Sequence, residues 1–467
     1  MYVWGQGKVS GHHNRGVKRA WPGWLTVVLC GLALWLTRAT SPDLLRDSDT
    51  AVLLTAIRQR HAPLSWFAGD WPLQNHFYRP VSTLTFEMDN ALWGNSAAGY
   101  AGTNAILAIL CVAALYWFLR ELTDRTPFAI AGTLLFTSWV LGYGDWLAGW
   151  VAISGWVVLG VGVWRNGLSV KRYLPAALAI GYLAWEVSGL HPLYGRVIAW
   201  LPGRTASTMT VFCLMAMASY ARYERLGARR RHRHEHGPLD PPATRSTTSF
   251  VLKERKAWAV LAVVSTALAL ASYEQAVMLP ACLLGVAISL RWQGKKTRWA
   301  WQAAFWGVLV GYLVLRYQVV PHTVSGYQRQ QYRTGMGAIQ DLGTYAFAPI
   351  STLLALVNGL SVGLIILFTA QPWFQMLEIA RGVAAVRVAA RDWRWPLTGW
   401  CLSLLAFLPM AFLKIFEHYH WWPMALRTIL VVGLAQAVGR SIVIAWSRPE
   451  RQAPPRPDPA PGSLPRP

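Results

Sequence analysis

The chain has 467 residues, of which 54% are hydrophobic and only 14% are charged, and its formal net charge is +23. Soluble domains have about a quarter of their residues charged, so this composition excludes an ordinary soluble protein. The positive charge gathers in loops between apolar segments, and membrane topology explains this better than nucleic-acid binding, so we expect no nucleic-acid partner.

Apolar segments long enough to cross a bilayer recur along the chain and predict an all-α polytopic membrane protein of about twelve transmembrane helices. The predicted spans cover roughly residues 22–39, 98–118, 128–144, 146–164, 173–190, 205–221, 257–272, 276–291, 300–320, 345–369, 396–413 and 424–446. Both termini and every strongly basic loop then fall on one side, which the positive-inside rule assigns to the cytoplasm.

This topology divides the chain into a basic cytoplasmic tail (1–21), a transmembrane domain (22–446) and a tail rich in proline and arginine (447–467), which we expect to be disordered. Residues 222–257 form the largest basic loop, and their Pro, Ser and Thr content predicts disorder. The arginines of residues 371–395 indicate an amphipathic helix along the membrane.

The first loop on the outer side, residues 40–97, is predicted to carry amphipathic helices and the chemistry. It gathers acids in a chain that has few elsewhere: Asp43, Asp47, Asp49, Asp70, Glu87 and Asp89. Asp47 or Asp49, close to the membrane surface, could act as a general base on an acceptor hydroxyl or hold a divalent cation. Either residue could equally cap the helix that AVLLTAIRQR predicts.

Outer-side arginines go against the usual charge bias and are therefore informative. Arg79 could clamp a phosphate with its planar guanidinium, or pair with Glu87 or Asp89 in the same loop. The others are Arg196, Arg204, Arg316, Arg329 and Arg333. Together they could form an electropositive pocket for a phosphate-bearing lipid.

Two acids lie in or beside apolar spans, where ionisable groups are costly and usually face a cavity or a partner. Glu274 lies between two predicted spans, and Glu186 lies inside the fifth. Each could serve a site or form a structural ion pair with an outer arginine. His418 and His420 are two residues apart, which is a poor helical spacing for metal ligands, so we interpret them as part of a polar loop and predict no metal site.

Five segments in one order carry a family resemblance. YRPVSTLTFEMDNALWGNSAAGYAGTN (78–104) is similar to a YRPLxxLSFxLDYALFG…GYHxTN signature, and HPLYGRVIAWLPGR (191–204) to HPxxxEAVAWxxGR. ASYEQAVMLP (271–280), GYLVLR (311–316) and EHYHWWP (417–423) are similar to SKExAxxLP, YLALR and ERYLYLP. Together they resemble the GT-C superfamily of membrane glycosyltransferases, in particular the transmembrane O-mannosyltransferase-like branch that often carries tetratricopeptide repeats. The chain lacks those repeats and departs from the motifs at Ala101, Arg196 and Tyr273.

The resemblance implies a GT-C-type fold and an inverting transfer of sugar from a polyprenyl-phosphate donor to a hydroxyl of a protein or glycan acceptor. The site would face away from the cytoplasm in the inner (plasma) membrane, with membrane lipids as partners and at most a divalent cation as cofactor. The resemblance places the catalytic base at Asp49, or next at Asp47, and the substrate-binding residues at Tyr78, Arg79, His191, Arg204, Glu274 and Arg316. The alternative is a transporter or flippase of lipid-linked sugars, which would need inverted repeats and paired intramembrane charges.

Overall fold

A computed structural model of the chain describes residues 12–60, 62–166, 180–189, 193–235, 245–295, 297–333, 335–346 and 393–446. Within them every regular element is a helix and there is no β-strand. The α-helices are α1 (His12–Leu36), α2 (Ser48–Arg60), α3 (Pro80–Trp93), α4 (Ala97–Thr123), α5 (Thr126–Val140), α6 (Gly144–Asn166), α8 (Tyr194–Val197), α9 (Arg204–Glu235), α10 (Arg245–Leu270), α11 (Leu279–Trp292), α12 (Ala300–Val319), α13 (Gly326–Gln331), α14 (Met336–Ala346), α18 (Arg394–Phe407) and α19 (Trp421–Trp446). Short 3₁₀ turns are η1 (Pro42–Leu45), η2 (Pro63–Ala68), η3 (Leu201–Gly203), η4 (Glu274–Met278), η5 (Leu408–Phe412) and η6 (Glu417–His420).

Five helical stretches in the described residues are long and apolar enough to cross a membrane, and this supports the predicted all-α membrane protein. They are Ala97–Thr123, Gly144–Val161, Glu274–Trp292, Arg394–Phe412 and Glu417–Arg440, and the shorter Trp21–Leu36 and Thr126–Val140 are also apolar. About twelve spans and a GT-C-type architecture stay predictions. The predicted span 345–369, the segment 371–395 and the tail 447–467 lie wholly or largely outside the described residues, as do residues 173–179 and 190 of the predicted span 173–190.

Local sequence accounts for several helix ends. Pro80, Pro127 and Pro280 lie in the first turns of α3, α5 and α11, where a missing N–H costs nothing and the fixed φ suits a helix. Gly94 ends α3 and Asp124 ends α4, both with positive φ, +56° and +60°. Such backbone conformations close the last turn of a helix.

The structure describes part of the basic segment 222–257, for which the sequence predicts disorder. Helix α9 continues to Glu235 and α10 begins at Arg245, so both helices extend into this segment. At its start, Arg225 of α9 lies 3.2 Å from Glu121 at the end of α4. The disorder of the segment stays a prediction.

The helices share one large apolar core, and the first loop has a smaller core of its own. The smaller core contains Leu44, Leu53, Leu54, Ile57, Trp66, Trp71, Phe86, Tyr100, Ala101 and Leu201. These residues come from the predicted loop 40–97, the first turns of α4 and the segment before α9. The loop with α2 and α3 is thus packed onto the end of the bundle.

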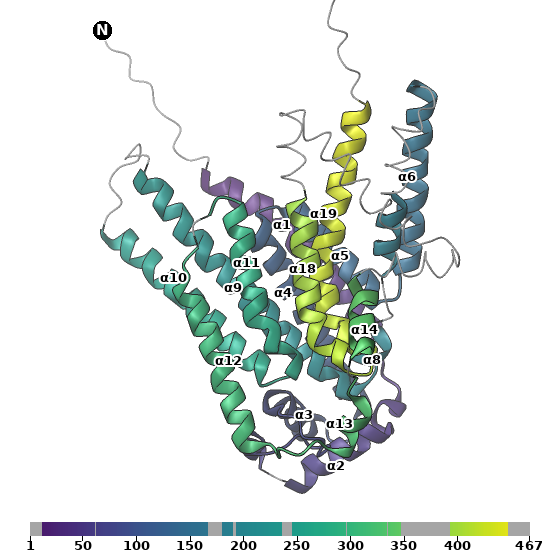
Figure 1. The fold of residues 1–467 in the computed structure, drawn as a ribbon, viewed down its shortest axis with the longest axis vertical. Coiled ribbons are helices and arrows are strands. Elements are labelled where there is room, and N and C mark those ends of the chain that lie inside the picture. The colour runs from purple at the N-terminus through teal and green to yellow at the C-terminus, as the bar shows by residue number, and fades with distance from the viewer. Residues whose placement is uncertain are drawn as a thin grey trace, which may run out of the picture.

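The first loop and the basic segments lie at opposite ends of α4. Tyr100 and Ala101 near its start belong to the core of the first loop. Glu121 near its end pairs with Arg222 and Arg225 of α9, at 3.3 and 3.2 Å. In Figure 1, α2, α3 and α13 lie together at the lower end of the bundle, and α1 begins at the upper end.

The segment that follows α12 packs against the first loop. The imidazole Nδ1 of His76 lies 2.6 Å from the carbonyl oxygen of Thr323. Ser325 donates its hydroxyl to the carbonyl of Asn75 at 3.2 Å, and the Gln328 side chain donates to the carbonyl of His76 at 3.2 Å. These bonds hold α13 beside the turn that precedes Arg79.

Candidate functional site

Asp47 directly precedes α2 and caps it, as the sequence allowed. Its Oδ2 atom accepts hydrogen bonds from the backbone N–H of Thr50 at 3.3 Å and from the Thr50 hydroxyl at 3.4 Å. The same oxygen accepts the indole N–H of Trp200 at 3.0 Å. Among the described residues Oδ1 has no hydrogen-bond partner, so the carboxylate is oriented through one oxygen while the other can accept a proton.

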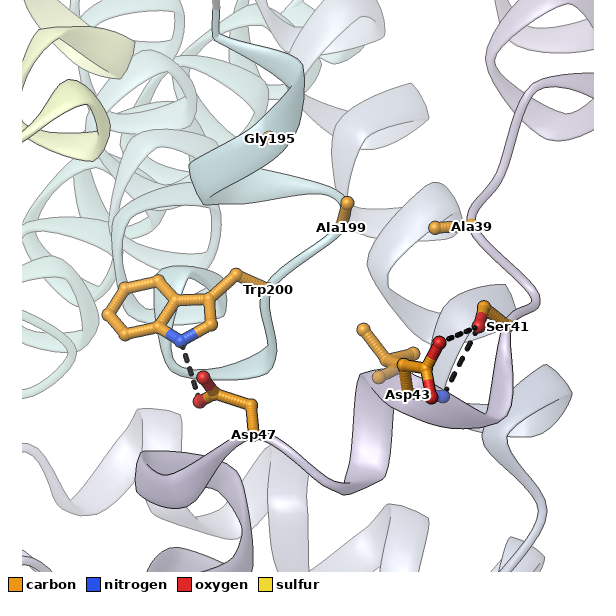
Figure 2. Close-up of a pocket in the computed structure, with 8 residues that line it drawn as sticks. Ala39, Ser41, Asp43, Asp47, Gly195, Ala199 and Trp200 are labelled. Atoms are coloured by element: carbon orange, nitrogen blue, oxygen red, sulfur yellow. Dashed lines mark hydrogen bonds between the residues drawn. The ribbon is translucent and has the colours of Figure 1, made fainter.

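A pocket of about 410 Å³ opens beside this carboxylate. Figure 2 shows Asp47 and Trp200 on one side of it and the Ser41–Asp43 turn on the other. Its lining residues are Ala39, Ser41, Asp43, Leu44, Asp47, Gly195, Ala199 and Trp200. Ligand pockets in proteins span roughly 300–1,000 Å³, so this one suits a small ligand.

Asp49 lies in the first turn of α2 and is exposed. Burial raises the pKa of the Tyr327 phenol in α13, Arg79 lowers this pKa and Asp49 raises it. Asp47 and Asp49 thus lie at one helix start, with Asp47 lining the pocket and Asp49 exposed.

Arg79 forms an ion pair with Glu274 in the turn between α10 and α11. Its Nε and Nη2 atoms each lie 2.8 Å from Oε2 of Glu274, while Oε1 accepts the backbone N–H of Tyr78 at 3.1 Å. Burial favours neutral Arg79, yet the Glu274 carboxylate raises the pKa of Arg79 above its usual value, so the guanidinium stays charged. Aromatic rings surround it, with Phe77 at 4.3 Å and Tyr273 at 4.4 Å from its Cζ atom.

Three buried donors near this ion pair have no hydrogen-bond partner in the described part of the chain. They are Nε1 of Trp71, the hydroxyl of Tyr312 and Nε of Arg316. Trp71 contacts the Arg79 guanidinium, and Tyr312 packs on Tyr78 with ring centroids 6.0 Å apart. Arg316 lies one turn after Tyr312 on the same face of α12. An unsatisfied buried donor costs roughly 1–3 kcal/mol, so this group of donors is suited to an anionic ligand.

Aromatic contacts connect the pocket to the ion pair. The ring centroids of Trp200 and His418 are 5.4 Å apart, and those of His418 and Tyr273 are 6.3 Å apart. Tyr273 in turn contacts Arg79. The rings of Trp200, His418 and Tyr273 thus form a continuous row of contacts. The carboxylate of Asp47 lies at one end of this row and the guanidinium of Arg79 at the other.

Arg204, which the sequence suggested as a site residue, is fully buried. Its Nη2 atom lies 2.6 Å from Asp89, and Nε donates to the Asn104 side chain at 2.7 Å. The remaining bonds go to the carbonyls of Thr85 at 3.2 Å and Tyr100 at 3.1 Å. Its guanidinium therefore ties α3 and α4 to the start of α9.

Glu186 has a structural partner, but it is not one of the outer arginines that the sequence suggested. Arg427 of α19 holds both its carboxylate oxygens, at 2.7 and 2.9 Å, and also donates to the carbonyl of Tyr345 at 2.9 Å. Both side chains are buried. Arg427 was overlooked because it lies within a predicted span, and an arginine at that depth was itself a signal.

The structure brings Asp47, Asp49, Arg79, Glu274 and Arg316 to one end of the bundle, with Tyr78 beside the ion pair. His191 lies outside the described residues. Sequence reasoning did not single out Trp200, Tyr312 or Tyr327, although each lies within a few residues of an outer arginine. Among the described residues no cluster of three His, Cys, Asp or Glu side chains is placed to hold a metal ion.

Comparisons with family models, curated proteins and solved structures found no match.

Proposed function

We propose that the protein is an integral-membrane inverting glycosyltransferase. It moves a sugar from a polyprenyl-phosphate donor to a hydroxyl of a protein or glycan acceptor on the extracytoplasmic side of the membrane. The observation that carries this proposal is the pairing, at one end of an apolar helical bundle, of an oriented carboxylate with a group of unsatisfied donors suited to an anion. The resemblance of five segments to GT-C enzymes supports it independently.

The acceptor hydroxyl is activated by Asp47. Three donors hold Oδ2 in place, so Oδ1 is the oxygen that takes the proton. As the proton leaves, the acceptor oxygen attacks the anomeric carbon from the face opposite the phosphate, which inverts the configuration. Asp49, which is exposed in the first turn of the same helix, is the second candidate for this role.

The phosphate leaves with the electron pair of the broken carbon–oxygen bond, so its negative charge increases in the transition state. Arg79 and Arg316, with the Tyr312 hydroxyl and the Trp71 indole N–H, supply the donors that stabilise this charge. Glu274 orients Arg79 through two contacts of 2.8 Å. The polyprenyl chain lies against the apolar helices.

Arg204 acts in this proposal as a framework residue rather than a phosphate ligand. Its guanidinium forms an ion pair with Asp89 and donates to Asn104 and to two backbone carbonyls, one in α3 and one in α4. The divalent cation that the sequence allowed would have to be held by Asp47 or Asp43 with its substrate, since the described residues offer no larger ligand cluster.

A transporter or flippase of lipid-linked sugars is the second candidate, and the buried Glu186–Arg427 pair favours it. Paired charges inside the membrane often mark moving helices. Here, however, Arg427 of α19 also donates to the carbonyl of Tyr345 in α14, which suits a rigid contact between helices rather than a moving one.

Reconstitution of the purified protein in vesicles with radiolabelled polyprenyl-phosphate sugars tests the proposal. The label should move to acceptor peptides or glycans supplied on one side only. Movement of intact labelled lipid between leaflets without transfer supports the flippase. If no hexosyl donor gives either transfer or movement between leaflets, both candidates are refuted.

A further inference from the structure

We infer that the pocket beside Asp47 is a subsite for a pyranose ring, with the indole of Trp200 as its platform. This inference rests on the proposed function, because it names the part of the substrate that the pocket holds. It begins from the pocket itself, which polar oxygens and an aromatic ring line together. Asp47 and Trp200 lie on one side, and Ser41 and Asp43 lie on the other.

This combination matches the chemistry of a sugar ring. A pyranose has hydroxyls around its edge and a face of C–H groups that packs well on an aromatic ring. Ser41, Asp43 and Asp47 supply the polar atoms, while Trp200 supplies the flat surface. The other lining residues include the small Ala39, Gly195 and Ala199, and a Cβ atom added at Gly195 would meet nothing within 4 Å.

Trp200 is held in position before any ligand arrives. Its indole N–H donates to Oδ2 of Asp47 at 3.0 Å, and its ring packs against the buried His418 at a 48° angle. A half-buried ring fixed at two points loses little conformational freedom on binding, which favours stacking. The same hydrogen bond leaves Oδ1 of Asp47 available, so a sugar on the indole lies beside the proposed base.

Saturation-transfer NMR on the full-length protein in detergent micelles, with methyl hexopyranosides as probes, tests the subsite. At least one hexoside should receive saturation on the C–H protons of a single ring face. Trp200→Leu should lower its affinity at least tenfold, whereas Trp200→Phe should retain most of it. Gly195→Leu should block binding by filling the pocket while leaving Trp200 intact.

Trp146→Leu is the matched control, because Trp146 is an exposed tryptophan on α6 and is not part of the pocket. It should bind like the wild type. Equal binding by wild type, Trp200→Leu and Gly195→Leu overturns the inference, as does the absence of saturation transfer to every hexoside tested.

Two sources of the sugar are separated by competition. A polyprenyl-phosphate hexose that displaces the methyl hexoside assigns the subsite to the donor, and displacement only by an acceptor glycan assigns it to the acceptor. Failure of the proposed function is a separate result. Binding that depends on Trp200 in a protein without transferase activity upholds the subsite, whereas transfer with an unchanged KM in Trp200→Leu refutes it.

Discussion

Arg79 and Glu274 meet across 195 residues of sequence, with Nε and Nη2 of the guanidinium each 2.8 Å from the same carboxylate oxygen. The pair joins the first loop to the turn between α10 and α11, beside the donors that we assign to the phosphate. Its side chains are 12% and 17% exposed, so it lies largely outside bulk water.

Glu274→Gln should destabilise the fold, because it leaves the Arg79 charge without its partner. Removal of one member of a buried pair typically lowers the free energy of unfolding by about 3–5 kcal/mol. Because this pair is partly exposed, we expect a loss near or below the lower limit of that range. Polyprenyl phosphate should restore part of the loss by supplying a new anion, and thermal unfolding in micelles with and without the lipid measures both effects. A lipid-induced stabilisation no larger than in the wild type would argue against an anion site at Arg79.

Asp47→Asn should reduce kcat by roughly 10²- to 10⁴-fold without loss of folded protein. Asparagine keeps an oxygen that can accept from Trp200 and Thr50, but it cannot take the acceptor proton. Single-turnover transfer of radiolabelled sugar measures the change, and Asp49→Asn serves as the comparison. If Asp49→Asn is inactive and Asp47→Asn is fully active, the base is Asp49.

Arg316→Ala should raise the KM for the lipid donor about tenfold and leave stability unchanged. Its Nε atom has no protein partner in the described residues, so its removal breaks no internal bond. Arg329→Ala is the control, since this arginine is exposed on α13 of the neighbouring loop. Equal KM values for both variants would exclude Arg316 from the phosphate site.

Arg204→Ala should lower the free energy of unfolding by about 3–5 kcal/mol, because it leaves buried Asp89 without its partner. Arg46→Ala is the matched control, since the Arg46–Asp43 pair is exposed and should contribute almost nothing. Chemical denaturation in mixed micelles compares the two. A small effect at Arg204 would mean that water enters this part of the loop.

Cysteine labelling tests the orientation. In a Cys401→Ser background, which removes the exposed native thiol, Leu64→Cys should react with an impermeant maleimide in intact cells. The backbone N–H of Arg298 donates to the carboxylate of Glu224 at the end of the bundle that carries the basic segments. Arg298→Cys should therefore react only after the membrane is permeabilised. The reverse pattern would put the site in the cytoplasm.

The sequence predicted the helical class and the acids of the first loop because both depend on local composition and apolar length. It could not pair Arg79 with Glu274, or Arg204 with Asp89, because these contacts join distant segments. For Arg79 the sequence offered Glu87 and Asp89, yet Glu87 accepts the Trp66 indole N–H at 2.6 Å instead.

The ion pairs at the start of the basic segment 222–257 also join distant parts of the chain. Arg222 pairs with Glu121 and Glu254, and Arg225 pairs with Glu121. Likewise, Trp200 has an ordinary place in the sequence, and only the fold brings its indole N–H to Asp47.

The start of helix α4 contributes Tyr100 and Ala101 to the core of the first loop, and its end contributes Glu121 to the ion pairs with α9. Its 27 residues correspond to a rigid rod of about 40 Å. A thinner bilayer must tilt such a rod, and the tilt would displace Tyr100 and the loop packed on it. Turnover should therefore respond to acyl-chain length even when the composition of head groups is held constant.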